Sequence, residues 1–130
     1  MYKIMNLTKI KFLLTLKTCS LAKKESILIS YHLNNKNLMS ILYKEGLIQS
    51  FNFQNLNNKV FIYLRYYYNR VLLDSIKILS KPSNNKYLKL KDLYKLNFKK
   101  RLFIISTTKG LKSLLDCKMN NLGGKVLFVC

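Results

Sequence analysis

The stretch LFIISTTKGLKSLLDCKMNNLGGKVLFV, residues 102–129, decides the fold. Residues 102–105 form a short apolar run, which is typical of a buried β-strand, and residues 125–129 predict a second strand of the same kind. Between them we expect Ser106–Gly110 to be a polar loop. The spacing of Leu111, Leu114 and Leu115 suggests a short helix. This stretch therefore predicts two strands separated by a loop and a helix.

Two glycines, Gly123 and Gly124, precede the last strand and are expected to turn the chain into it. Upstream, Ser75 to Leu79 and Lys86 to Leu90 predict two more strands, joined by polar turn residues from Lys81 to Asn85. The second half of the chain should therefore form a mainly antiparallel sheet with a short helix.

The first half of the chain has the order helix, strand, helix, strand, strand. A basic amphipathic helix is predicted from Ile4 to about Thr18, because apolar residues fall in a stripe at helical spacing: Ile4, Leu7, Ile10, Leu13 and Leu14. Ser26 to Tyr31 predicts a strand, and Asn34 and Asn35 are plausible N-caps of a second helix that stops at Gly46. Two strands follow, at Leu47–Phe53 and Val60–Arg65, with a hairpin loop at Asn55–Lys59 between them.

The segment Tyr66–Arg70 interrupts the alternating pattern and contains neither Gly nor Pro, so we expect a short, stiff connection there. A domain boundary is placed near residue 69. The predicted fold is α+β, with a small N-terminal α/β domain at residues 1–68 and a β-rich C-terminal domain at residues 69–130.

The charge of the chain is strongly unbalanced. Lysine and arginine total 24 against five acidic residues, a formal net charge of +19 in 130 residues. Such self-repulsion implies a polyanionic partner, either nucleic acid or an anionic membrane surface. The longest uncharged stretch, Gly46 to Asn58, is rich in Asn and Gln and far shorter than the ~20 apolar residues of a membrane span.

An enzyme is not expected. No phosphate-binding glycine loop, nucleophile motif or metal-ligand spacing is present, and the one histidine, His32, follows a predicted strand. The three cysteines lie far apart, which indicates a reducing compartment and isolated thiols. We therefore expect no catalytic residue, metal, cofactor or small-molecule substrate. A peripheral membrane adaptor remains the alternative, because the first predicted helix is basic and amphipathic.

Five segments, in this order, resemble one known family, the bacterial-type small-subunit ribosomal protein eight: ILYKEGLIQSF at 41–51, SIKILSKPS at 75–83, KDLYKL at 91–96, IISTTKGL at 104–111 and LGGKVLFV at 122–129. The resemblance implies two small α/β domains that bind a helix in the central domain of small-subunit ribosomal RNA. It implies a structural role in assembly and translation, beside neighbouring small-subunit ribosomal proteins.

The resemblance also implies which residues contact the RNA. The main candidates are the hydroxyl side chains and the two residues that follow them, Ser106, Thr107, Thr108, Lys109 and Gly110; the others are Gly124, Tyr87, Lys81, Lys17 and Lys11. Small hydroxyl side chains suit the shallow minor groove of RNA, and lysines neutralise phosphates. Each candidate also has a simpler interpretation. The hydroxyl loop can be a solvated turn, Gly124 a turn glycine, Tyr87 a packing residue, and the lysines part of a solvated cationic surface.

Some positions depart from the family pattern. The family has a glycine-rich run before the strand at 102–105, where this chain has Asn97–Arg101. It has an acidic residue after the glycine pair, where this chain has Lys125. The abundance of Asn and Lys is typical of AT-rich coding sequence. We therefore expect a mitochondrial ribosome, in the mitochondrial matrix, with a plastid or the cytoplasm of an AT-rich bacterium as alternatives.

Overall fold

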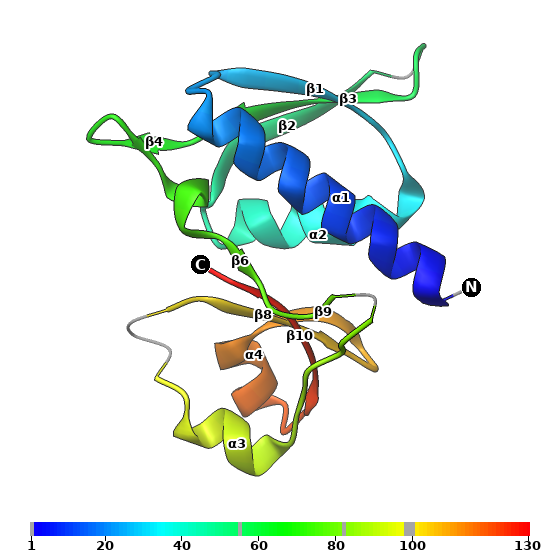
Figure 1. Ribbon diagram of the computed structural model, residues 1–130, viewed down its shortest axis with the longest axis vertical. Helices are drawn as coiled ribbons and strands as arrows, with labels where there is room; N and C mark the ends of the chain where they lie inside the picture. The colour runs from blue at the N-terminus through cyan, green and yellow to red at the C-terminus, as the bar shows by residue number, and fades with distance from the viewer. Residues whose placement is uncertain (1, 55, 82, 98–100) are drawn as a thin grey trace. The chain divides into compact units, whose positions relative to one another are not determined.

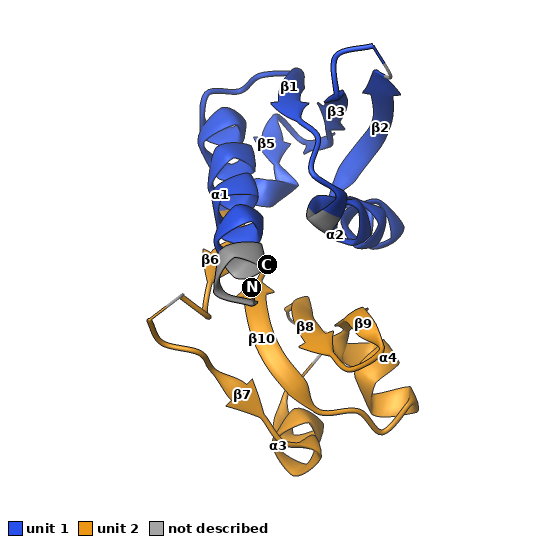
Figure 2. Cartoon of the chain, turned by 90° about the vertical axis from the view of Figure 1, so that its right-hand side faces the viewer, with its two compact units in different colours: residues 1–74 blue, residues 75–130 orange. Residues whose placement is uncertain are grey.

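The computed structural model describes residues 2–54, 56–81, 83–97 and 101–130. Its contacts divide the chain into two compact units, Met1–Asp74 and Ser75–Cys130, hereafter unit 1 and unit 2 (Figure 2). Each unit is considered by itself. The parts of the expected turns that fall on Asn55 and Pro82, and most of the divergent segment 97–101, lie outside the described residues.

Unit 1 has the predicted order of elements. These are α1 (Tyr2–Leu21), β1 (Ser26–Ser30), α2 (Leu33–Lys44), β2 (Ile48–Gln54) and β3 (Lys59–Leu64). The strands form an antiparallel sheet in the order β1–β3–β2, with β3 in the centre. Helices α1 and α2 pack against each other (Figure 1). The prediction of an α+β fold is confirmed for this half of the chain.

The buried face of α1 differs from the predicted stripe. Phe12, Leu13 and Leu16 are at most 4% exposed, whereas Leu7 and Leu14 are 40% and 48% exposed. Phe12 and Leu16 are four residues apart and so lie on one side of the helix, with Leu13 beside them. One side of the helix is buried, but it is centred on a different set of side chains from the predicted stripe, and the exposed side carries leucines as well as lysines, so the expected amphipathic pattern is weak.

The predicted caps of α2 are half correct. The helix begins at Leu33, so the two expected N-caps, Asn34 and Asn35, lie inside it, and His32 occupies the cap position without a side-chain cap hydrogen bond. The prediction of these caps was wrong because the tertiary fold starts the helix earlier than its side-chain chemistry suggests. The predicted end is confirmed: Gly46 has φ +74° and follows the C-cap Glu45.

The connection after β3 is a second small hairpin. Strands β4 (Tyr66–Tyr67) and β5 (Arg70–Val71) pair across a turn in which Tyr68 and Asn69 have φ of +46° and +59°. The expected short connection is therefore a hairpin: two non-glycine residues in the left-handed region close a two-residue turn that no sequence pattern indicated.

This hairpin and the 3₁₀ turn η1 (Leu72–Ser75) are bonded to the first half of the chain. The backbone N–H of Leu72 donates to the Arg65 carbonyl at 3.4 Å, and the Ser20 hydroxyl donates to the Asp74 carboxylate at 2.9 Å. These bonds explain why the contacts divide the chain after Asp74, whereas the sequence placed the division near residue 69.

Unit 2 is a small sheet with two short helices. Its elements are β6 (Lys77–Ile78), β7 (Tyr87–Leu88), α3 (Leu90–Lys95), β8 (Phe103–Thr107), β9 (Gly110–Ser113), α4 (Leu114–Met119) and β10 (Gly124–Val129). The antiparallel order is β6–β10–β8–β9, and β7 also pairs with β10. Strand β10 therefore has β8 along one edge and β6 and β7 along the other (Figure 2).

Three details of unit 2 correct the sequence analysis. The expected strand at residues 86–90 is shorter, and helix α3 begins at its end. The expected loop Ser106–Gly110 is mostly strand: only Thr108 and Lys109 lie between β8 and β9. Leu111 lies in β9 and not in the helix. Elements of four to six residues span too few periods for a sequence pattern to separate strand from helix.

The core of unit 2 lies between the sheet and its two helices. One cluster of buried residues there consists of Ile105 and Val126 from the sheet, Leu93 from α3, and Leu114 and Cys117 from α4. Burial raises the pKa of the Cys117 thiol, and the neighbouring Asp116 adds to the effect. Cys117 is therefore a neutral packing residue.

Two adjacent leucines of α4 give a matched test of this core. Leu114 is 1% exposed and Leu115 is 47% exposed. We expect Leu114→Ala to lower the free energy of unfolding by about 2–5 kcal/mol, because it leaves a cavity in the core. Leu115→Ala removes the same atoms from a half-solvated position and should cost less than about 1 kcal/mol. Urea denaturation of the full chain measures both, and equal losses would contradict the packing described above.

Candidate RNA interface

The predicted hydroxyl loop is the tip of a tight hairpin. Thr107 at the end of β8 pairs with Gly110 at the start of β9, and Thr108 and Lys109 form the exposed turn between them. Gly110 has φ +99°, a backbone conformation that side chains with a Cβ rarely adopt. The glycine thus allows the sharp return of the chain at the tip.

The three hydroxyls of this hairpin are not equivalent. The Thr107 hydroxyl donates to the Gly110 carbonyl at 2.8 Å and accepts the Lys109 backbone N–H at 3.2 Å, so it holds the turn in place. Neither the Ser106 nor the Thr108 hydroxyl has a hydrogen-bond partner among the described residues. The hydroxyls of Ser106 and Thr108 are therefore available to an external ligand, whereas the Thr107 hydroxyl is used in hydrogen bonds within the turn.

Three candidate positions meet in one row across the sheet. Lys125 of β10 is the register partner of Tyr87 on one side and of Ser106 on the other. Direct partners in an antiparallel sheet point to the same face, so these three side chains share a face. Two strand spacings separate Tyr87 from Ser106, which is about 10 Å. Tyr87 is 70% exposed, whereas Lys125 is 8% exposed.

The adjacent row of side chains has a different environment. Ile105 and Val126 are also register partners, and both belong to the core beneath α3 and α4. Because side chains alternate along a strand, the face that carries Tyr87, Lys125 and Ser106 is the one that turns away from these helices at this end of the sheet. We call these three residues and the turn Thr108–Lys109 the sheet-end face.

Gly124 is a strand residue with a packing requirement. A Cβ at this position would lie well under 3.0 Å from the Ser106 carbonyl oxygen, closer than real Cβ atoms come to any neighbour. Gly124 thus lets β10 and β8 approach each other where the sheet-end face begins. It is therefore a strand residue and not the simple turn glycine of the alternative interpretation, while its contact with RNA stays a prediction.

The segment around Lys81 is anchored to the same strand. The buried Ser80 hydroxyl donates to the Val126 carbonyl and accepts the Lys86 backbone N–H at 3.1 Å. Lys81 and Asn84 exchange two backbone hydrogen bonds of 3.0 and 3.1 Å, and the Lys81 side chain is exposed. Sequence reasoning missed both Ser80 and Lys125, because only the strand register places Lys125 on this face and only the hydrogen bond to Val126 ties Ser80 to β10.

The remaining candidates, Lys11 and Lys17, belong to α1 in unit 1. Lys11 is exposed and Lys17 is half-buried. Six residues apart, they are separated by roughly 120° around the helix axis. A spacing of six residues therefore puts the two lysines on different sides of the helix, and they do not form one stripe. Lys9, close to Lys11 in the chain, is partly buried, and desolvation lowers its pKa.

Comparison with known proteins assigns the family. The family model described as Ribosomal protein S8 matches residues 10–130. This chain belongs to the ribosomal protein S8 family. The match covers both units and includes every candidate contact residue named above.

Relatives of the S8 family come from organelles and from bacteria. The chain is 34% identical over 125 residues to the chloroplast small ribosomal subunit protein uS8c of Bigelowiella natans, a match that covers 91% of this chain and 93% of that protein. It is 36% identical over 93 residues to the mitochondrial protein uS8m of Acanthamoeba castellanii, with 70% and 72% covered. The uS8 protein of Ehrlichia chaffeensis is 29% identical over 119 residues, with 89% and 90% covered.

Membership in the S8 family establishes the class of function. The chain is a structural constituent of the small ribosomal subunit, from a family that binds ribosomal RNA and is not an enzyme family. The resemblance found in the sequence is thereby confirmed. Within the described residues, no helix has the length and apolar character needed to cross a membrane.

The two threonines of the hairpin give a test of their separate roles. We expect Thr107→Val to lower the free energy of unfolding by about 0.5–1.5 kcal/mol for each of the two hydrogen bonds lost. Thr108→Val removes a hydroxyl that makes neither bond and should change stability by less than about 0.5 kcal/mol. Thermal unfolding gives the comparison, and hydrogen exchange of the Lys109 amide should rise only in the first variant. Equal effects would refute the described turn.

Proposed function

We propose that this S8 protein binds a helix in the central domain of small-subunit ribosomal RNA mainly through the sheet-end face of unit 2. One observation carries the proposal: residues far apart in the sequence, Tyr87, Ser106 and the turn Thr108–Lys109, surround the same end of strand β10. Their chemistry suits RNA, and they include the hydroxyls that the hairpin leaves unused.

The hydroxyls provide the selective part of the contact. Double-stranded RNA exposes 2′-hydroxyls and base edges in a wide, shallow minor groove, which small side chains on a close-approaching backbone can reach. Ser106 and Thr108 can each donate and accept a hydrogen bond to such groups. Gly110 keeps the tip narrow, and Thr107 keeps it rigid through its bonds to Gly110 and Lys109. A preformed tip loses little entropy when it binds.

The cationic and aromatic residues provide the contacts with phosphates and with an unstacked base. Lys109 is exposed at the tip and Lys81 at the anchored turn, where each can neutralise a phosphate. The exposed ring of Tyr87 can stack on a base that is not stacked in the RNA helix. Gly124 acts indirectly, by allowing β8 to lie close to β10.

Lys11 and Lys17 extend the proposal to unit 1. Their positions on different sides of α1 suit contacts with phosphates of separate strands or segments better than a joint grip on one phosphate. Such contacts carry no sequence information but add affinity that falls with salt. Neighbouring small-subunit ribosomal proteins are the other expected partners, and no membrane or small-molecule substrate is part of the proposal.

We also propose that the chain acts only as a structural protein. The described residues contain no group of three or more His, Cys, Asp or Glu side chains that could hold a metal ion. His32 takes the N-cap position of α2 and makes no side-chain cap hydrogen bond. No described carboxylate is paired with it in a way that suggests acid–base chemistry.

The proposed location is the mitochondrial ribosome. A mitochondrial and a chloroplast relative both support an organellar origin, and the composition, rich in Lys and Asn, supports an AT-rich genome. The chloroplast relative makes the plastid the second candidate. Mass spectrometry of small subunits purified from the two organelles distinguishes them, because the chain should be found in the mitochondrial particle and be absent from the plastid one.

The double variant Ser106→Ala/Thr108→Ala tests selectivity. The wild-type chain should bind the central-domain RNA helix more tightly than a scrambled duplex of equal length. Loss of two hydroxyl contacts should reduce this preference by about tenfold, since each hydrogen bond contributes about 0.5–1.5 kcal/mol. Gel-shift titration of both RNAs at one moderate salt concentration measures the preference. Equal binding of the wild type to both RNAs would show that the chain binds RNA through its positive charge alone, and would refute the proposal.

Lys109→Ala tests the phosphate contact at the tip. We expect it to weaken binding to all RNA duplexes alike and to reduce the slope of log K against log salt by roughly one unit. Lys91→Ala removes the same charge from the exposed surface of α3 and serves as the control. A slope that changes equally in both variants would show that Lys109 contributes only to the overall charge.

A further inference from the structure

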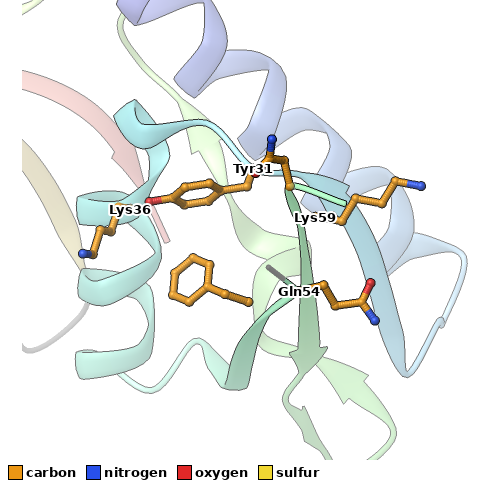
Figure 3. Close-up of a pocket in the computed structure, with 6 residues that line it drawn as sticks. Tyr31, Lys36, Gln54 and Lys59 are labelled. Carbon is orange, nitrogen blue, oxygen red and sulfur yellow. The ribbon is translucent and has the colours of Figure 1, made fainter. Parts of the chain in front are cut away.

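Unit 1 contains a hollow that the proposed contact through unit 2 does not use. Its volume is about 270 Å³, and it is open to solvent. The lining residues are Tyr31, Lys36, Phe53, Gln54, Asn58 and Lys59. They come from the connection between β1 and α2, from the second turn of α2, and from the ends of β2 and β3 where the hairpin between them begins (Figure 3).

We propose that this hollow binds one unstacked nucleotide of single-stranded RNA. The inference rests on the proposed function in one respect, since the nucleotide would belong to the same ribosomal RNA. The residues concerned are different from those of the sheet-end face and lie in the other unit.

The aromatic wall of the hollow is held in place by packing. The rings of Tyr31 and Phe53 meet edge to face with centroids 5.0 Å apart. Phe53 meets Phe51 in the same way at 5.5 Å, and Phe51 meets Tyr43 of α2 at 5.9 Å. Tyr31 is thus the last of four rings in a row, and its free side borders the hollow. Such a fixed ring is suited to stack on a base.

The backbone fixes the same wall. The N–H of Tyr31 donates to the Asn58 carbonyl at 2.7 Å, which ties the β1–α2 connection to the β2–β3 hairpin. Asn58 has φ +47°, so the chain turns sharply at this point. The aromatic and amide sides of the hollow are therefore joined before any ligand arrives.

The polar residues indicate which ligand fits. Lys36 and Lys59 supply two positive charges at the rim, and both side chains are exposed. Figure 3 shows Tyr31 directed toward α2, where Lys36 lies, while Gln54 and Lys59 extend from the sheet on the other side. The described lining contains no carboxylate. A phosphate on either side of a bound base would therefore meet a lysine.

The two amides favour a base over an acidic peptide. A carboxylate accepts hydrogen bonds only, whereas the side chains of Gln54 and Asn58 each present a donor and an acceptor. A nucleobase edge also presents both kinds of group. The volume is slightly below the roughly 300–1,000 Å³ of pockets for drug-sized ligands, which suits one base with its ribose.

The test uses the full chain and a fluorescent single-stranded hexauridylate at low salt. Ultraviolet crosslinking followed by mass spectrometry should place the main crosslink at Tyr31 or Phe53. Tyr31→Ala should weaken binding by at least about fivefold, which corresponds to the loss of one stacked base. Tyr31→Phe keeps the ring and should bind within about twofold of the wild type. Hexaglutamate should compete poorly at equal charge.

Lys36→Ala provides a variant at an exposed position that leaves the aromatic wall intact. It should lower the salt slope of hexauridylate binding by about 0.7, the value for one phosphate contact in a single strand. Lys24→Ala, also exposed in unit 1, is the matched control and should leave the slope unchanged. Equal slopes in the two variants, a main crosslink outside the hollow, or full competition by hexaglutamate would each overturn the proposal.

The outcome is separable from that of the sheet-end face. If selective binding to the central-domain helix persists while hexauridylate does not crosslink in the hollow, only the nucleotide site fails. If hexauridylate crosslinks at Tyr31 while the chain does not prefer the central-domain helix, the nucleotide site stands and the proposed role of the sheet-end face fails.

Discussion

The close approach of Gly124 to the Ser106 carbonyl is the constraint on which unit 2 depends. Strand β10 pairs with β8 on one edge and with β6 and β7 on the other, so every strand of the sheet except β9 is bonded to it. A side chain at position 124 would force β8 away at the point where Lys125 pairs with Ser106 and Tyr87. The geometry of the sheet-end face thus follows from the absence of one Cβ.

The excess of positive charge is the second constraint on the molecule. With 24 basic and five acidic residues, at least nineteen cations (24 − 5) have no carboxylate of their own. A fold with this excess is under self-repulsion that a polyanion relieves. The two binding surfaces proposed here use that charge differently: at the sheet-end face lysines flank hydroxyls, and at the hollow in unit 1 they flank aromatic rings and amides. Charge supplies affinity in both, and the neutral groups supply selectivity.

Features that depend on local chemistry were predictable from the sequence. Gly46 ends α2 as expected, the strands of unit 1 are in the predicted order, and the apolar run before Cys130 forms β10. The RNA-contact residues suggested by the family resemblance remain a prediction. The resemblance itself came from specific strings such as the Ser-Thr-Thr-Lys-Gly segment, which periodicity alone would have assigned to a loop.

Features that depend on tertiary contacts were not predictable. The α2 cap falls on His32 and not on an Asn, and the turn at Tyr68 and Asn69 uses left-handed residues other than glycine. The row formed by Tyr87, Lys125 and Ser106 exists only through strand register. The hollow beside Tyr31 joins residues from five elements and connections, so no single stretch of sequence indicates it.

The position of β10 along the chain has a consequence for biosynthesis. The strand with the most partners is β3 in the three-stranded sheet of unit 1 and β10 in the sheet of unit 2; β3 precedes Asp74, whereas β10 follows every other strand of its sheet. Chains are synthesised from the N-terminus and domains generally fold as units. Unit 1 can therefore assemble while unit 2 is still being made, but β6, β7 and β8 have no central partner until residues 124–129 have emerged. The sheet-end face, which is the proposed RNA contact, consequently forms only after the whole of β10 has been synthesised.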